Sequence, residues 1–196
     1  MQSRTIVAAL AVAAACRSAG PSYYTLVAPP DDSAALPSGE LQLDILPVEV
    51  PPEVDRAEIV VREGRGQLTP VETRSWISPL PREIRRAFAN ELSQALGARD
   101  IAGLTPAEGI PLFRIKLAVQ RFESALGKRA LIEAVSTIRE TTGDTPGLVC
   151  SHRAREVAGA GYDGLAEAHQ RALAKIAQQV AASVRSLRGG AGGCAP

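Results

Sequence analysis

The run "LFRIKLAVQRFESALGKRALIEAVSTIRE" (residues 112–140) decides the fold that the sequence predicts. Apolar residues alternate strictly from Phe113 to Val119, which is typical of a β-strand with one buried face. Phe122 then falls out of step with this alternation, and a β-bulge near Gln120 would explain the shift. The run therefore predicts a long strand with one irregularity near its middle.

Further strands flank this one along the chain. Gly127 and "TTGDTPG" (141–147) indicate turns, so that residues 129–140 and 147–156 complete a three-stranded antiparallel meander. Upstream, "AEIVVRE" and "GQLTPVET" are short apolar-polar runs separated by glycines, which predicts a hairpin. The earlier run "LQLDILPVEVP" (41–51) changes phase at Pro47, which favours a strand with a bulge or an edge strand.

Two segments have the periodicity of amphipathic helices. In "PREIRRAFANELSQALG" (81–97), Pro81 suits the first helical turn and Gly97 is placed to end the helix. In residues 163–189, Asp163 is expected to cap the start of the helix and Gly189 its end. The apolar residues of this second segment recur at helical spacing: Leu165, Ala172, Leu173, Ile176, Val180, Val184 and Leu187. The predicted fold is α+β, a two-layer sandwich of a mostly antiparallel sheet with both helices on one face.

The amino terminus has the features of an export signal. Arg4 precedes ten apolar residues, Ile6 to Ala15, whereas a helix that crosses a bilayer needs about 20. Residues 1–15 are therefore predicted to be a signal peptide, after which Cys16 begins the mature chain. The stretch resembles a bacterial lipobox, although Ala13 stands where leucine is usual, so Cys16 is the predicted site of a lipid such as palmitate. Plain secretion is the alternative.

The mature chain divides into three predicted parts: a tether over 16–39, one domain over 40–188 and a glycine-rich tail over 189–196. Proline, serine and glycine dominate the tether, which as a flexible chain would span about 25 Å. Tyr23 and Tyr24 are too apolar for a solvated linker, and we expect them to contact the domain edge or a partner protein.

Charge and cysteine content limit the classes of function. The chain has 22 basic and 21 acidic residues, and the basic residues are interspersed with glutamate, which argues against nucleic-acid binding. The sequence contains no nucleotide-binding glycine motif, and its cysteines lack the short spacing of a zinc site, so we expect no cofactor or metal. If Cys16 carries a lipid, Cys150 and Cys194 remain as a possible disulfide in an oxidising compartment.

Candidate catalytic residues are few. Cys150 and His152 would share a face of one strand, as an activated thiolate would require, but no third orienting group follows in the sequence, and a buried cysteine beside a hydrogen-bonded histidine is common. Trp76 precedes the first helix, where an aromatic side chain more often holds the start of a helix than binds a ligand. The sequence therefore does not predict an enzyme.

A family resemblance extends across nearly the whole mature chain, from about Tyr23 to Leu187. Its most specific parts are "YYTL" soon after Cys16, "DRAEIV" (55–60), the residues from Trp76 to Pro79, and Arg121 with Phe122. With the closing amphipathic helix, these features resemble the ABC-type transport auxiliary lipoproteins of the paraquat-inducible C type.

The resemblance implies a non-enzymatic, periplasm-facing lipoprotein that works with an MCE-domain protein and a membrane permease in lipid transport between the two membranes. It implies docking at the outer membrane, a role in envelope integrity and a homo-oligomeric ring. Arg17 is consistent with an outer-membrane location, because it does not resemble the aspartate that retains lipoproteins at the inner membrane. The alternative is a stand-alone lipoprotein that binds a small hydrophobic ligand.

Overall fold

The computed structural model describes residues 20–29, 38–141 and 146–194. The elements follow one another in the order β1 (Ser22–Tyr24), β2 (Gln42–Ile45), the 3-10 helix η1 (Pro52–Val54), β3 (Glu58–Arg62), β4 (Leu68–Trp76), α1 (Leu80–Leu96), β5 (Arg99–Asp100), β6 (Leu112–Ala125), β7 (Arg129–Glu140), β8 (Leu148–Val157) and α2 (Gly161–Arg188).

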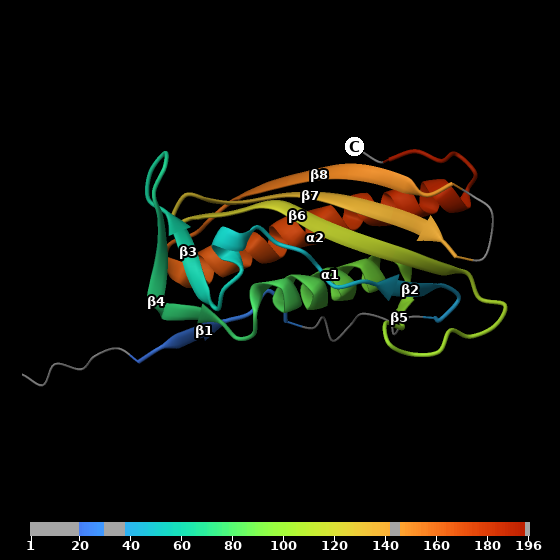
Figure 1. Ribbon diagram of the computed structural model, residues 1–196, viewed down its shortest axis with the longest axis horizontal. Helices are drawn as coiled ribbons and strands as arrows, with labels where there is room; N and C mark the ends of the chain where they lie inside the picture. The colour runs from blue at the N-terminus through green and yellow to red at the C-terminus, as the bar shows by residue number, and fades with distance from the viewer. Residues whose placement is uncertain (1–19, 30–37, 142–145, 195–196) are drawn as a thin grey trace, which may run out of the picture.

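One mixed sheet of eight strands forms the first layer (Figure 1). The long strand β6 pairs antiparallel with β7, and β7 pairs antiparallel with β8, as the sequence predicts. The other edge of β6 is shared by two strands. The start of β6 pairs with β2, which carries β5 on its far side, and its end meets β3 of the predicted hairpin. The sheet therefore has a continuous half and a divided half.

The predicted bulge in β6 lies where the alternation of the sequence changes. The pairing of β6 with β7 shifts between Val119 and Arg121. Before the shift, Ile115 and Leu117 point into the core; after it, Phe122 and Ser124 do so, and all four are buried. Because one extra residue changes the face that side chains reach, the bulge keeps both halves of the strand facing the core.

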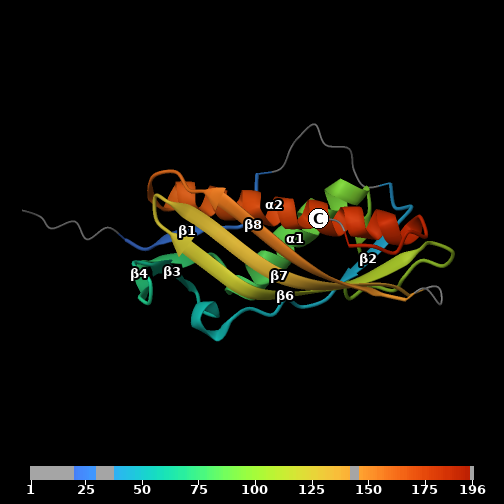
Figure 2. The ribbon, with the colours of Figure 1, turned by 90° about the horizontal axis from the view of Figure 1, so that it is seen from above.

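Both helices lie on one face of the sheet, which confirms the predicted α+β two-layer architecture (Figure 2). The helix α2 packs along β6, β7 and β8, and α1 packs beside it and against β2 and β5. Every apolar residue predicted for the α2 stripe is buried. The predicted cap at Asp163 is wrong: Ala160 is the N-cap residue and Asp163 lies in the first turn. Gly97 ends α1 in the left-handed conformation that glycine favours.

The structure decides two local predictions. The segment 41–51 pairs with β6 at Gln42–Ile45 and again at an isolated bridge between Glu49 and Ala118, with one extra residue between the two contacts, which confirms the predicted bulge. The edge-strand alternative is wrong, because β2 lies between β6 and β5. Trp76 is the last residue of β4, and its ring packs edge-on against Phe122 and His169 in the core. Its ring therefore joins the sheet to α2.

The largest difference from the prediction concerns residues 16–39, because part of this predicted tether belongs to the folded domain. β1 adds a parallel strand beside β4, and Leu26 is buried in the core. The folded domain thus begins near Ser22, not at residue 40. The sequence does not reveal this strand, because three residues are too few to show a periodic pattern and the partner strand β4 lies far along the chain.

Candidate functional site

A buried carboxylate fixes the N-terminal segment to the domain. Glu83, in the first turn of α1, is fully buried, and its oxygens accept hydrogen bonds from three donors. These donors are the Thr25 hydroxyl at 2.7 Å, the Leu26 amide at 3.0 Å and the Ser78 hydroxyl at 2.6 Å. The positive end of the helix dipole also favours a carboxylate here. We call this arrangement the Glu83 clamp.

The clamp determines how far the domain lies from Cys16. Cys16 itself lies outside the described residues. The chain from Cys16 to Ser22 contains six residue steps, which span at most about 20 Å when fully extended. The connection available for an anchor therefore contains far fewer residues than the tether predicted over 16–39. It joins the folded domain at β1.

The structure separates the two tyrosines predicted to contact a partner. Tyr24 is partly buried, and its ring centroid lies 6.1 Å from that of Tyr162 at the start of α2. Tyr23 points away from the core and is 60% exposed. Tyr24 therefore packs on its own domain, and only Tyr23 has a surface that a partner could reach.

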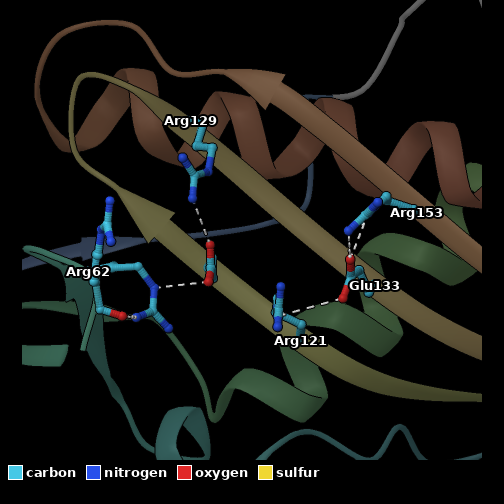
Figure 3. A network of polar contacts seen from close by, with 7 residues as sticks. Arg62, Arg121, Arg129, Glu133 and Arg153 are labelled. Carbon is cyan, nitrogen blue, oxygen red and sulfur yellow. Dashed lines mark hydrogen bonds and ion pairs between the residues drawn. The ribbon is translucent and has the colours of Figure 1, made fainter. Parts of the chain in front are cut away.

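A network of guanidinium and carboxylate groups covers the helix-free face of the sheet, as Figure 3 shows. Glu133 of β7 lies between Arg121 of β6, 3.6 Å away, and Arg153 of β8, whose Nε donates to Glu133 at 2.7 Å. Glu123 in turn lies between Arg62 at 2.9 Å and Arg129 at 3.1 Å. The sequence alone does not predict this network, because its members lie on separate strands.

The bulge explains why Arg121 and Phe122 stand together in the sequence. It places Gln120 and Arg121 together on the exposed face, so that Arg121 joins the network and the next residue, Phe122, enters the core. There the Phe122 ring stacks on the ring of His169 with centroids 4.0 Å apart. A pair of residues that the sequence presents as one motif thus serves two separate faces.

Two buried histidines each contact a serine. Ser124 Oγ lies 2.9 Å from His169 Nε2, and Ser136 Oγ lies 2.8 Å from His152 Nε2. His152 also contacts Gln179 of α2 through Nδ1 at 3.3 Å. Both serines are buried beneath α2, so a substrate would have no path to them, and the pairs serve packing. Cys150 is likewise buried and bonded to Cys194, so the considered thiolate with His152 does not form.

The histidines predict a dependence of stability on pH. Burial lowers the pKa of His169 to about 3 from its ordinary value of 6.5, and it also lowers the pKa of His152. Below pH 6.5 the unfolded chain therefore binds protons that the folded chain does not, and the free energy of unfolding falls. For His169 the expected slope is up to about 1.4 kcal/mol per pH unit toward pH 4. Urea unfolding between pH 7.5 and 4.5 measures it.

The matched variant for this measurement is His169→Gln, which cannot gain the proton. Its stability is expected to be lower at pH 7 but to change less steeply with acidification than that of the wild type. Equal slopes in the two proteins would show that His169 takes up its proton in the folded state too.

The structure joins Cys150 of β8 to Cys194 of the C-terminal tail by a disulfide, with Cα atoms 5.6 Å apart. The bond closes a sequence separation of 44 residues and holds the tail beside the outer strand β8. A cross-link of this loop length restricts the unfolded chain. We expect Cys194→Ser to lower the free energy of unfolding by about 2–4 kcal/mol.

Thermal melting with and without dithiothreitol tests the bond. The reductant should lower the melting temperature of the oxidised wild type to that of Cys194→Ser and leave the variant unchanged. An unchanged wild-type melting temperature, with the two thiols found free in a non-reducing peptide map, would contradict the pairing.

The described residues contain neither a cluster of metal ligands nor a helix that could span a membrane. Among residues 20–29, 38–141 and 146–194, no three His, Cys, Asp or Glu side chains gather as metal ligands would. No helix in these ranges is both long and apolar enough to cross a membrane.

Comparison with known proteins identifies the class. The family model of the ABC-type transport auxiliary lipoprotein component matches residues 24–181. Because this range includes most of the chain and nearly every element of the fold, the chain belongs to that family. The family consists of auxiliary lipoprotein components of ABC-type transport systems, which are anchored in the cell envelope by lipid and are not described as catalytic. No curated protein matches the chain.

Solved structures support the fold. An uncharacterised protein of known crystal structure superposes with a TM-score of 0.66 at 16% identity, over 85% of this chain and 99% of that one. Protein XCC0632 from Xanthomonas campestris gives a TM-score of 0.61 at 15% identity, over 88% and 97% of the two chains. The PelC dodecamer from Paraburkholderia phytofirmans gives only 0.42 at 10% identity, over 71% and 87%, and we draw no conclusion from its assembly.

Proposed function

We propose that the protein is a lipid-anchored subunit of an MCE-domain transport system that moves lipids between the inner and outer membranes. In this proposal it docks the assembly at the outer membrane and so supports envelope integrity. Membership of the auxiliary lipoprotein family over residues 24–181 is the observation that carries the proposal. The partners would be an MCE-domain protein and a permease, and several copies would form a ring around the end of the conduit.

The position of the N-terminal segment supports an orientation for the domain. The strand β1 lies at the end of the molecule that also holds the β3–β4 turn, the β6–β7 turn and the start of α2 (Figures 1 and 2). We call this the anchor end. With Cys16 lipidated, this end would face the outer membrane, and the opposite end would face the periplasm and the transporter.

The opposite end offers an apolar contact surface. Leu104, in the segment between β5 and β6, is 68% exposed, and beside it lies a hollow of about 220 Å³. Ile101 and Ile110 contribute to the lining of this hollow. An apolar side chain of a partner protein could enter it. Leu104 is therefore a better candidate for contact with the transporter than Tyr23, which lies at the anchor end.

The anchor is tested by mass spectrometry of the mature protein from its native envelope. We expect a diacylated or triacylated Cys16 as the first residue and release of Cys16→Ser from the membrane fraction, since two or more acyl chains give stable anchoring. An unmodified Cys16 would contradict the lipid anchor. Separation of inner and outer membranes tests the outer-membrane assignment independently.

Affinity purification from native membranes tests the partners. The wild type and Leu126→Asp, changed at the anchor end, should retain an MCE-domain protein and a permease, whereas Leu104→Asp should lose them. Both changed residues are exposed, so neither substitution should alter folding. A strictly monomeric wild type without any transport component would favour the alternative, a stand-alone lipoprotein that binds a small hydrophobic ligand.

A further inference from the structure

Basic side chains gather on the helix-free face of the sheet near the anchor end. Seven of them surround three carboxylates, Glu63, Glu123 and Glu133, and leave an excess of four positive charges on a chain whose formal net charge is +1. We call this set the basic face; its members are Arg62, Arg65, Arg121, Lys128, Arg129, Arg153 and Arg155.

The carboxylates of the basic face do not neutralise it. Glu123 and Glu133 each lie between two arginines, so each group of three keeps one positive charge and a fixed geometry. The remaining cations, Arg65, Lys128 and Arg155, have no ion-pair partner among the described residues. Four arginines are thus held in place while three basic side chains stay free to bind an anion.

The shape of the basic face suits phosphate groups. A hollow of about 500 Å³ is lined by Arg62, Arg65 and Lys128 together with other members of the set. A second hollow of about 340 Å³ lies beside Arg153 and Arg155. Guanidinium groups bind phosphate through paired N–H donors, and an ammonium group adds a mobile point charge.

Charge is not distributed in this way along the rest of the same face. Farther from the anchor end, Arg114 forms an ion pair with Asp44 at 2.7 Å, and Lys116 forms one with Glu49 at 2.6 Å. There these two cations each have their own carboxylate, and Arg139, opposite Arg114 on β7, has no ion-pair partner among the described residues. The five charges named here leave an excess of one positive charge, so the larger excess lies in the half of the sheet nearest to β1.

From these observations we propose that the basic face binds the phosphate groups of anionic phospholipids in the leaflet that holds the anchor. The inference rests on the lipid anchor of the proposed function, because the short connection from Cys16 to Ser22 keeps this end within about 20 Å of the membrane. Two exposed apolar residues, Leu126 and Val157, flank the basic side chains and can enter the interfacial region of a bilayer. The domain then rests on the membrane in one orientation and does not rotate freely about its anchor.

The test uses the mature chain, residues 16–196, with Cys16→Ser, so that no acyl chain contributes to binding. Its sedimentation is measured with vesicles of phosphatidylethanolamine containing phosphatidylglycerol and with uncharged phosphatidylcholine vesicles. The variant Arg65→Gln/Lys128→Gln/Arg155→Gln removes the three unpaired cations. The matched control, Arg99→Gln/Arg139→Gln/Arg188→Gln, removes three exposed basic residues at the opposite end of the molecule whose side chains have no ion-pair partner among the described residues.

We expect the parent chain to bind the anionic vesicles and not the uncharged ones. The basic-face variant should bind at least tenfold more weakly, since each basic residue near an anionic surface contributes a factor of about five. The control should stay within about twofold of the parent. All three proteins should melt alike, because every changed residue lies on the surface.

Three results would overturn the proposal: no binding to anionic vesicles, equal loss in both triple variants, or displacement by 10 mM inorganic phosphate at constant ionic strength, which would indicate a site for a small free anion. The measurement involves neither the lipid on Cys16 nor the transporter. Its failure is therefore distinguishable from failure of the proposed function.

Discussion

Replacement of Ile176 by aspartate is expected to unfold the domain. Ile176 is fully buried at the centre of the α2 stripe, where α2 packs against both the sheet and α1. The substitution removes a large apolar side chain and places an unpaired carboxylate in the core. We expect a loss of about 5 kcal/mol or more, comparable with the whole free energy of unfolding of a domain of this size.

The control is Gln178→Asp, which adds the same charge to the exposed side of α2. Circular dichroism during heating should show no cooperative transition for Ile176→Asp and a nearly unchanged one for Gln178→Asp. If Ile176→Asp melted like the wild type, α2 could not occupy the core, and the two-layer architecture would be wrong.

The second large effect is expected for Glu83→Ala. The change removes the acceptor for two hydroxyl groups and for the Leu26 amide, and it opens a space in a buried site. The hydroxyl groups can rotate toward other acceptors, but the Leu26 amide belongs to the backbone and can reach another acceptor only if the backbone moves. We expect a loss of about 3–5 kcal/mol, because an unsatisfied buried donor costs about 1–3 kcal/mol.

Hydrogen exchange distinguishes loss of the Glu83 clamp from general destabilisation. In Glu83→Ala, amides of residues 22–27 should exchange far faster than in the wild type, while those of β6 and β7 should change only by the overall loss of stability. Glu91→Ala, farther along the same helix and only partly buried, is the matched control and should leave residues 22–27 protected. Unchanged protection of residues 22–27 in Glu83→Ala would mean that β1 holds its place without the clamp.

Patterns within single elements allowed most of the fold to be predicted. Strict alternation in β6 and its change at Gln120 locate a strand and a bulge, because side chains on a strand reach opposite faces in turn. The stripe from Leu165 to Leu187 identifies α2 and its buried side in the same way. These signals are local, so one sequence suffices to reveal them.

Contacts between distant segments explain what the sequence concealed. The Glu83 clamp joins residues 25 and 83, and β1 is too short to show a period of its own. Likewise, Arg121, Glu133 and Arg153 become neighbours only through the register of three strands, which the bulge shifts by one residue. The charged residues of these strands can be read from the sequence, but which of them become neighbours depends on that register.

Photo-crosslinking in living cells tests the central claim most directly. A photoreactive amino acid is placed at position 104, at the periplasmic end, or at position 126, at the anchor end, and adducts are identified by mass spectrometry. The proposed function predicts an adduct with an MCE-domain protein or permease at position 104 and none with these proteins at position 126. Transport components captured at position 126 alone, or at neither position, would contradict it.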